Sequence, residues 1–181
     1  SDDPFRDFNK LTNHFKLFQF SNVSIALSAE IGEGTVIQPN TFVGNHVVIG
    51  ENCLIHSNVS IYDHTIIGDN VIIHAGTILG ADAFYYKKRL EGYDKLLSSG
   101  SVVIEDNVDI GALCTIDRGV TANTTIKKGT KIDNQVQIGH DTIVGYNCLI
   151  AAQTGVAGCV IVEDNVILWG QVGVTSGVTI G

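Results

Sequence analysis

Aliphatic side chains return at every sixth position over most of the chain. The series is Ile25, Ile31, Ile37, Val43, Ile49, Ile55, Ile61, Ile67, Ile73 and Leu79, then Ile104, Ile110 and Ile116, and, after a slip of four residues, Ile126, Ile132, Ile138, Val144, Ile150, Val156, Val162, Leu168, Val174 and Ile180. Four residues after these positions come small or β-branched residues such as Thr35 and Val47, which suit a tight interior corner. A six-residue period is typical of parallel β-helices, whose coils bury their apolar edges only by stacking on their neighbours.

Each coil of this β-helix is expected to hold three hexapeptides. In the hexapeptide proteins that the pattern resembles, three repeats form a triangular coil of about 18 residues, and the winding is left-handed, against the usual crossover rule. Residues that far apart would stack at a strand spacing of about 4.8 Å. The predicted external ladders are Gln135 with Gln153 and Gln171, His46 with His64, and His56 with His74. The predicted fold class is therefore all-β, a left-handed parallel β-helix.

Two segments lie outside the repeat. In the first, residues 1–20, Asp3 can cap a helix and Pro4 suits its first turn. One face of this predicted helical arm or linker would carry Phe5, Phe8, Leu11 and Phe15. The second segment, at about residues 80–101, breaks the period, and a loop of that length in a compact domain is more often functional than decorative. We therefore expect an arm at 1–20 and a β-helix at 21–181 with one long inserted loop.

Composition narrows the classes of function. The formal net charge of −8 gives a field that repels nucleic acid and anionic membrane surfaces, so we expect no nucleic-acid partner. Neither a signal peptide nor a run of about 18 apolar residues is visible, so we expect a cytoplasmic protein without a membrane span. The chain starts at Ser1 and stops in mid-repeat, which suggests part of a longer protein. Four cysteines lack CxxC spacing and are expected to be reduced core residues, the first three of them at the same inward repeat position: Cys53, Cys114, Cys148 and Cys159.

His140 is the candidate for chemistry among the six histidines. It comes second after the inward Ile138, which predicts an outward or corner position, and Gly158 stands three hexapeptides further along the chain. An imidazole base next to a glycine N–H that a substrate can approach closely would supply proton removal and oxyanion stabilisation, the two requirements of acyl transfer. The common alternative for such a residue is a solvated histidine on a polar surface. Only the position of His140 in the repeat argues against that alternative here.

Three stretches of the sequence resemble the UDP-3-O-acylglucosamine N-acyltransferases of lipid A biosynthesis. They are residues 73–82, residues 103–119 and, above all, the run Ile132-Asp133-Asn134-Gln135 to Gly139-His140. The resemblance covers residues 3–181 and implies a homotrimer with active sites between subunits. It also implies His140 as general base, an oxyanion contact from Gly158, and Asp133 and Asn134 near the substrate.

The same resemblance implies the substrates. The donor would be a hydroxyacyl chain on the phosphopantetheine thioester of acyl carrier protein, and the acceptor would be the 2-amine of a UDP-linked 3-O-acylglucosamine. No tightly bound cofactor and no metal ion are expected. Two positions depart from the family, because Ala83-Phe84-Tyr85-Tyr86 replaces Gly-Phe-Gly-Phe and Gly177 replaces a second histidine. The resemblance is to the central solenoid alone, without the uridine-binding domain, so we expect this chain to bind UDP-sugars weakly.

Three alternatives stay open at this point. A coenzyme A-dependent acetyltransferase acting on a nucleotide-linked amino sugar would share the fold, and the tyrosines of the inserted loop together with the missing second histidine keep it in view. A carbonic anhydrase-like enzyme would need three histidine ligands for zinc between subunits. A purely structural solenoid would need no site, and the run from Asp133 to His140 argues against it.

Overall fold

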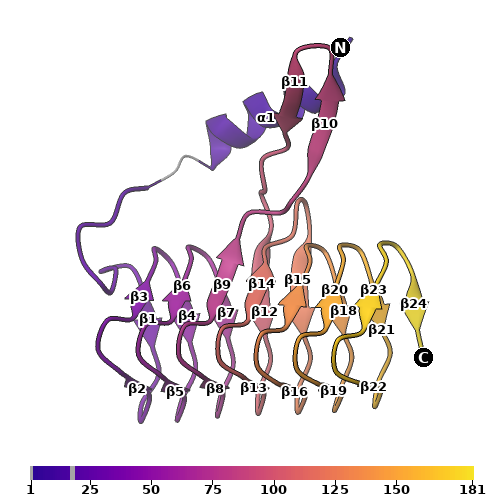
Figure 1. Cartoon of the computed structure of the whole chain (residues 1–181). Coiled ribbons are helices and arrows are strands. Elements are labelled where there is room, and N and C mark those ends of the chain that lie inside the picture. Colours follow the sequence, from indigo (N-terminus) through magenta and orange to yellow (C-terminus); the bar gives the residue numbers. More distant parts are fainter. Residues whose placement is uncertain (1, 17–18) are drawn as a thin grey trace.

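A computed structural model describes residues 2–16 and 19–181 of the chain. It is a triangular solenoid of three parallel sheets, with a helix and a hairpin projecting from one side (Figure 1). Sheet 1 holds β1 (Glu30–Ile31), β4 (Val48–Ile49), β7 (Ile66–Ile67), β12 (Ser101–Ile104), β15 (Asn123–Ile126), β18 (Ile143–Val144), β21 (Ile161–Val162) and β24 (Thr179–Ile180). Sheet 2 holds β2 (Val36–Ile37), β5 (Leu54–Ile55), β8 (Ile72–Ile73), β13 (Asp109–Ile110), β16 (Lys131–Ile132), β19 (Leu149–Ile150) and β22 (Ile167–Leu168). Sheet 3 holds β3 (Phe42–Val43), β6 (Ser60–Ile61), β9 (Ile78–Ala81), β14 (Thr115–Asp117), β17 (Gln137–Ile138), β20 (Gly155–Val156) and β23 (Gly173–Val174).

The register confirms that each coil holds three hexapeptides. Within the regular part, each strand pairs with the strand three hexapeptides further on, as Ile49 does with Ile67 and Ile138 with Val156. The inserted segment and the four-residue slip lengthen two coils, yet Ile67 still pairs with Ile104. The predicted all-β class, a left-handed parallel β-helix of hexapeptide repeats, is confirmed.

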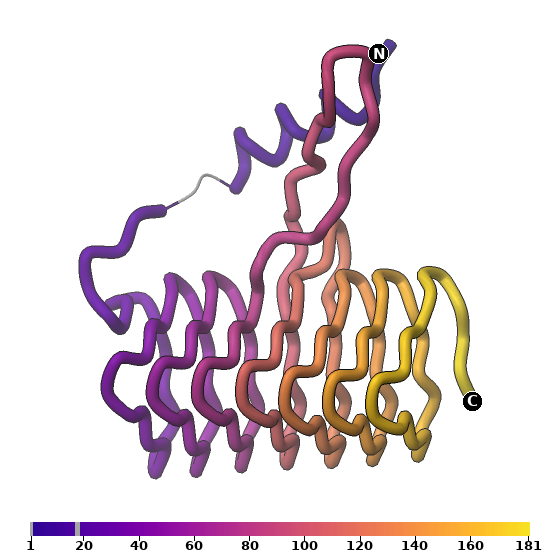
Figure 2. Tube along the Cα trace, in the orientation of Figure 1, coloured from indigo at the N-terminus to yellow at the C-terminus, as the bar shows by residue number. Residues whose placement is uncertain are grey.

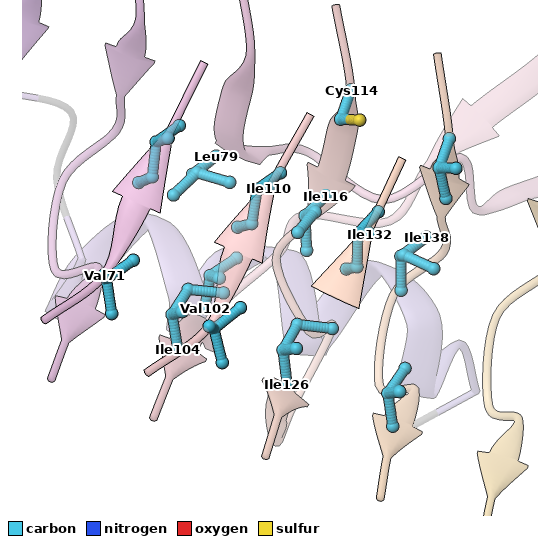
Figure 3. Close-up of a cluster of buried hydrophobic side chains, with 14 of the residues drawn as sticks. Val71, Leu79, Val102, Ile104, Ile110, Cys114, Ile116, Ile126, Ile132 and Ile138 are labelled. Carbon is cyan, nitrogen blue, oxygen red and sulfur yellow. The ribbon is translucent and has the colours of Figure 1, made fainter. Parts of the chain in front are cut away.

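The repeated aliphatic residues fill the interior of the solenoid. Figure 3 shows such side chains from successive coils in contact, among them Leu79, Ile110 and Ile138, each with no exposed surface. At the open N-terminal end Ile25 and Ile31 remain 39% and 40% exposed, because no earlier coil covers them. Burial by stacking therefore accounts for the core, as the period predicts.

Corner residues turn the chain between the sheets. A left-handed backbone recurs at one corner position, with φ near +60° at residues such as Asn52, Asn70 and Asn147, and asparagine is among the residues that tolerate it best. Buried threonines close the same corners: Thr130 Oγ1 donates to the carbonyl of Gly145 over 2.8 Å and accepts the N–H of Cys148. The small β-branched residues of the repeat thus satisfy backbone groups inside the solenoid.

The predicted ladders form along the outer edges. Gln153 donates to Gln135, and Gln171 donates to Gln153, each over 2.9 Å. The rings of His46 and His64 stack with centroids 5.2 Å apart, and those of His56 and His74 lie 4.7 Å apart. Each ladder joins positions three hexapeptides apart, as the coil length predicts.

Cysteine burial follows the prediction at three of the four positions. Cys53, Cys114 and Cys148 are buried, but Cys159 is exposed, so the prediction that all four are core residues is wrong for that one. Cys159 occupies a corner with φ of 61° rather than an inward position, which is why its side chain leaves the core.

The arm packs on the inserted segment. Helix α1 (Pro4–Phe15) begins at the Asp3 cap, as predicted, and lies along the antiparallel hairpin of β10 (Tyr86–Arg89) and β11 (Gly92–Lys95) (Figures 1 and 2). Arg89 bridges Asp3 and Asp94 at 2.7 and 3.0 Å. The segment predicted as a long loop therefore contains a hairpin, which the helix holds through polar contacts.

The helix buries its apolar side chains only in part. Leu11 and Phe15, on the predicted apolar face, are 58% and 77% exposed, whereas Thr12 is buried. Polar groups of the helix also contact the segment that carries the hairpin: Asn9 Nδ2 donates to the carbonyl of Lys95, and Asn9 Oδ1 accepts the N–H of Leu97. No helix in the described part of the chain is long and apolar enough to span a membrane.

Candidate functional site

His140 lies at a corner between sheets 3 and 1. It follows β17 after Gly139, and its carbonyl accepts the N–H of Cys159 from the next coil over 2.8 Å. Its ring lies over Gly158, because a Cβ added to Gly158 would come within 2.5 Å of His140 Nε2 and 2.8 Å of the other ring atoms nearby. The predicted stacking of these two residues is thus what the structure shows, and only glycine leaves room for the ring.

Asp141 fixes the orientation of this ring. Its Oδ2 lies 2.8 Å from His140 Nδ1, and both side chains are mostly buried. The carboxylate also accepts the N–H groups of Val120 at 2.8 Å and Ala122 at 3.1 Å. Burial alone would raise the pKa of Asp141, but these hydrogen bonds outweigh it and lower the pKa below its ordinary value. An ionised acceptor at Nδ1 assigns the ring proton to that atom and leaves the lone pair of Nε2 available as a base.

Two further groups surround the ring. Tyr85, from the inserted segment, meets His140 edge to face with centroids 5.7 Å apart. Asp117, at the end of β14, accepts a hydrogen bond from Gln137 Nε2 over 2.9 Å. Burial raises the pKa of Asp117 to about 6, against the opposing effects of the Gln137 hydrogen bond and of His140. The corner thus combines an imidazole, its carboxylate partner, an aromatic ring and a second carboxyl group nearby.

Asp133 and Asn134 lie on another edge of the solenoid. They follow β16, at the corner between sheets 2 and 3, where Asp133 Oδ1 accepts the N–H of Asn134 and Asn134 Oδ1 accepts the N–H of Ala112, both at 2.7 Å. Within one chain the structure does not bring them to His140. Asp133 instead borders a shallow apolar groove of about 310 Å³ that also includes Trp169.

Three groups at the site were not predicted from the sequence. Asp141 directly follows His140, and an acidic residue next to a candidate base was the available signal. No sequence signal points to Tyr85 or Asp117 at this corner, because an insertion and a slipped register separate them from it. One group of side chains could hold a metal ion, because ligand atoms of His140, Asp141 and Cys159 lie within 4.8 Å of one another. The carboxylate of Asp141, however, already accepts backbone N–H groups.

The chain is similar in sequence and in fold to bacterial hexapeptide-repeat transferases. Residues 46–81 and 123–158 match the family of bacterial transferase hexapeptide repeats. The UDP-N-acetylglucosamine acyltransferase of Francisella novicida superposes with a TM-score of 0.80 at 31% identity, covering 90% of this chain and 58% of that one. The UDP-N-acetylglucosamine O-acyltransferase of Moraxella catarrhalis gives 0.76 at 28% identity, covering 86% and 59%. The chain is thus a hexapeptide-repeat solenoid of the kind found in bacterial acyltransferases.

Within that class, the chain is similar to UDP-3-O-acylglucosamine N-acyltransferases. The Helicobacter hepaticus protein of that name is 51% identical over 174 residues, which are 96% of this chain and 53% of that protein. The Methylobacterium nodulans protein is 46% identical over 106 residues, or 59% and 30%. The resemblance inferred from the motifs is confirmed, and the chain spans about half the length of the Helicobacter relative and less of the Methylobacterium one.

Proposed function

We propose that the complete protein transfers a hydroxyacyl chain from acyl carrier protein to the 2-amine of a UDP-linked 3-O-acylglucosamine, in the cytoplasm, as a step of lipid A synthesis. The observation that carries this proposal is the His140 corner, where a carboxylate holds Nδ1 and a glycine lies beneath Nε2. The names of the relatives support the reaction class. The donor, the acceptor and the compartment are parts of the proposal.

The corner has the groups that aminolysis of a thioester needs. His140 Nε2 removes a proton from the amine as the nitrogen attacks the thioester carbonyl, and it returns that proton to the departing thiolate. Asp141 stabilises the imidazolium formed in between. No hydrogen bond found among the described residues uses the N–H of Gly158, so that donor is available for the developing oxyanion. No tightly bound cofactor takes part, because the thioester already activates the acyl group.

Asp133 and Asn134 fit this scheme only through a second subunit. They lie on a different edge from His140, so a neighbouring copy has to present them to the substrate. Outward aliphatic side chains are available for such packing on sheets 1 and 2: Val36, Val48, Ile66, Ile143, Leu149, Ile161 and Ile167 are each between 37% and 51% exposed. We therefore propose a homotrimer with sites between subunits.

Light scattering tests this assembly with the chain itself. A trimer gives three times the monomer mass of 19.4 kDa. A monomer at micromolar concentration contradicts the shared site. In a monomer, Asp133 lies on a different edge from His140, so Asp133→Ala should not change acceptor binding. In a trimer, the same substitution should weaken acceptor binding without changing the mass.

Substrate choice is tested in the complete protein. We expect acyl transfer from hydroxyacyl-acyl carrier protein to the 3-O-acylated UDP-glucosamine, and little from acetyl-coenzyme A or to the unacylated sugar. Preference for acetyl-coenzyme A would favour the acetyltransferase alternative. Stoichiometric zinc with hydration of carbon dioxide would favour the carbonic anhydrase alternative, and no turnover of any substrate would favour a structural role.

A further inference from the structure

One carboxyl group near His140 has no role in the mechanism above. Asp117 ends β14, and the pairing of Ile116 with Ile138 aligns it with the coil that carries His140. Its Oδ2 accepts a hydrogen bond from Gln137 Nε2 over 2.9 Å, and Gln137 lies three residues before His140 in the chain. The side chain is half-buried, so its carboxyl group is partly removed from bulk solvent.

The neighbouring acids already have partners. Asp82, on the adjacent coil, forms an ion pair with Lys95 at 2.6 Å, and Asp141 is held by backbone N–H groups and the His140 ring. Among the ion pairs found within residues 2–16 and 19–181, none includes Asp117. A half-buried carboxylate without a cation next to a base can therefore receive a cationic ligand.

An amine acceptor arrives with such a charge. Alkylamines are largely protonated near neutral pH, whereas a sugar hydroxyl is neutral, so a carboxylate at the acceptor site would favour an amine over a hydroxyl. We infer that Asp117 binds the ammonium form of the acceptor and holds its nitrogen next to His140. This inference rests on the proposed function, because it assigns the feature of the site that selects an amine.

The proton balance is consistent with this role. The bound ammonium ion releases one proton to water and becomes the neutral amine, whose lone pair attacks the thioester carbon. His140 takes the second proton as the new C–N bond forms, and the thiolate receives it when the C–S bond breaks. Asp117 is a substrate-binding residue in this sequence, and His140 remains the base.

The charges around Asp117 set the pH range of the effect. Burial and the nearby Asp82 raise its pKa to about 6, and Gln137 and His140 act in the opposite direction. Asp82 itself forms an ion pair with Lys95. At pH 7 the carboxylate is therefore mostly ionised in the free enzyme, and its attraction for an ammonium ion is lost as the pH falls through about 6.

The test compares a cationic and a neutral ligand in the complete protein. UDP-glucosamine and UDP-glucose, which carry an amine and a hydroxyl at the same carbon, are used as inhibitors against the acylated acceptor. In the wild type at pH 7 we expect the amine to bind more tightly by roughly 10-fold, since a hydrogen bond to a charged group contributes that much or more. Asp117→Asn should abolish this preference and leave the affinity for UDP-glucose within about 2-fold.

A matched variant and a second pH complete the design. Glu91→Gln, at the exposed tip of the hairpin, removes one negative charge away from the corner and should keep the preference. At pH 9 the amine is neutral, and the wild-type preference should shrink. Equal inhibition by both sugars in the wild type, or equal weakening of both by Asp117→Asn, overturns the inference. Acylation of the amine by the wild type is scored separately, so failure of the proposed function is a distinct result.

Discussion

The edge between sheets 3 and 1 carries two kinds of histidine. His46 and His64 stand three places after an inward aliphatic residue, take φ angles of 55° and 65°, and stack on each other. His140 stands one place earlier in the repeat, and Asp141 takes the left-handed corner position after it, with φ of 55°. The ring of His140 consequently lies over Gly158 of the next coil instead of over another imidazole.

A shift of one place in a repeat thus separates a surface ladder from a candidate base. At the left-handed corner the side chain points away from the solenoid and meets the same position one coil later. One place earlier it lies over the backbone of the next coil, where only glycine leaves room, and the corner residue can supply a carboxylate. Position in the repeat, and not residue type, decides what a histidine does here.

His140→Ala is the largest expected effect and tests this contrast directly. Removing the base should lower turnover of the complete enzyme by about 10² to 10⁴. The state of assembly and the thermal unfolding temperature should change little, because the side chain lies outside the aliphatic core. His46→Ala, at the stacked ladder, should change turnover by less than about 2-fold. If His140→Ala keeps more than a tenth of wild-type turnover with its assembly intact, the base lies elsewhere.

Asp141→Asn should produce the next largest effect. The amide leaves Nδ1 without its anionic partner, and we expect turnover to fall by about 10- to 100-fold, the range found for the carboxylate partners of metal-bound histidines. The variant should also lose about 1 kcal/mol of unfolding free energy at pH 7, since three backbone N–H groups lose a charged acceptor. The folded-state pKa of Asp141 is lowered, so this stability difference exists above its unfolded pKa of about 3.9 and should vanish as the pH falls through the folded value.

Denaturant titrations at pH 7 and pH 3 measure the stability part, and steady-state rates measure the catalytic part. A stability difference that grows towards low pH would show that the hydrogen bonds do not hold the carboxylate in its ionised form. Wild-type rates in the variant would show that Asp141 does not orient the ring.

Gly158→Ala changes the surface on which the His140 ring lies. Its Cβ would lie 2.5 Å from His140 Nε2, so the imidazole must move, and we expect about a 10-fold loss of turnover for a displaced base. Gly173→Ala is the matched control, because a Cβ at that position on β23 meets nothing within 4 Å. Equal rates in the two alanine variants would mean that the ring does not occupy this place during catalysis.

His64→Gln should have the smallest effect, confined to the pH dependence of stability. Burial lowers the pKa of His64, and the charges of Lys16, His46 and Arg118 add to this. The folded state therefore disfavours the imidazolium, so wild-type stability should fall as the pH drops below the unfolded value of about 6.5. Thermal unfolding at pH 7.5 and 5.5 should show a smaller decrease in the glutamine variant. An identical decrease in both proteins would contradict the lowered pKa.

The sequence determined the fold because each part of the repeat depends on local spacing. Aliphatic residues every six positions can be buried together only in a stacked solenoid, and the coil of three hexapeptides then places Gly158 on His140 by simple counting. The exposure of Cys159 could have been predicted in the same way, since it lies one coil above the corner residue Asp141.

Tertiary structure alone decided which distant residues join His140. Tyr85 reaches the ring through the packing of an insertion that follows no repeat, and Asp117 lies on a coil that four extra residues lengthen. The arm shows the same limit, because its amphipathic pattern does not determine which side chains meet the hairpin segment: Asn9 binds Lys95 and Leu97, whereas Leu11 and Phe15 stay exposed. In a regular solenoid, the period alone determines which residues stack on each other. The contacts of an insertion depend instead on its own folded conformation, which no period describes.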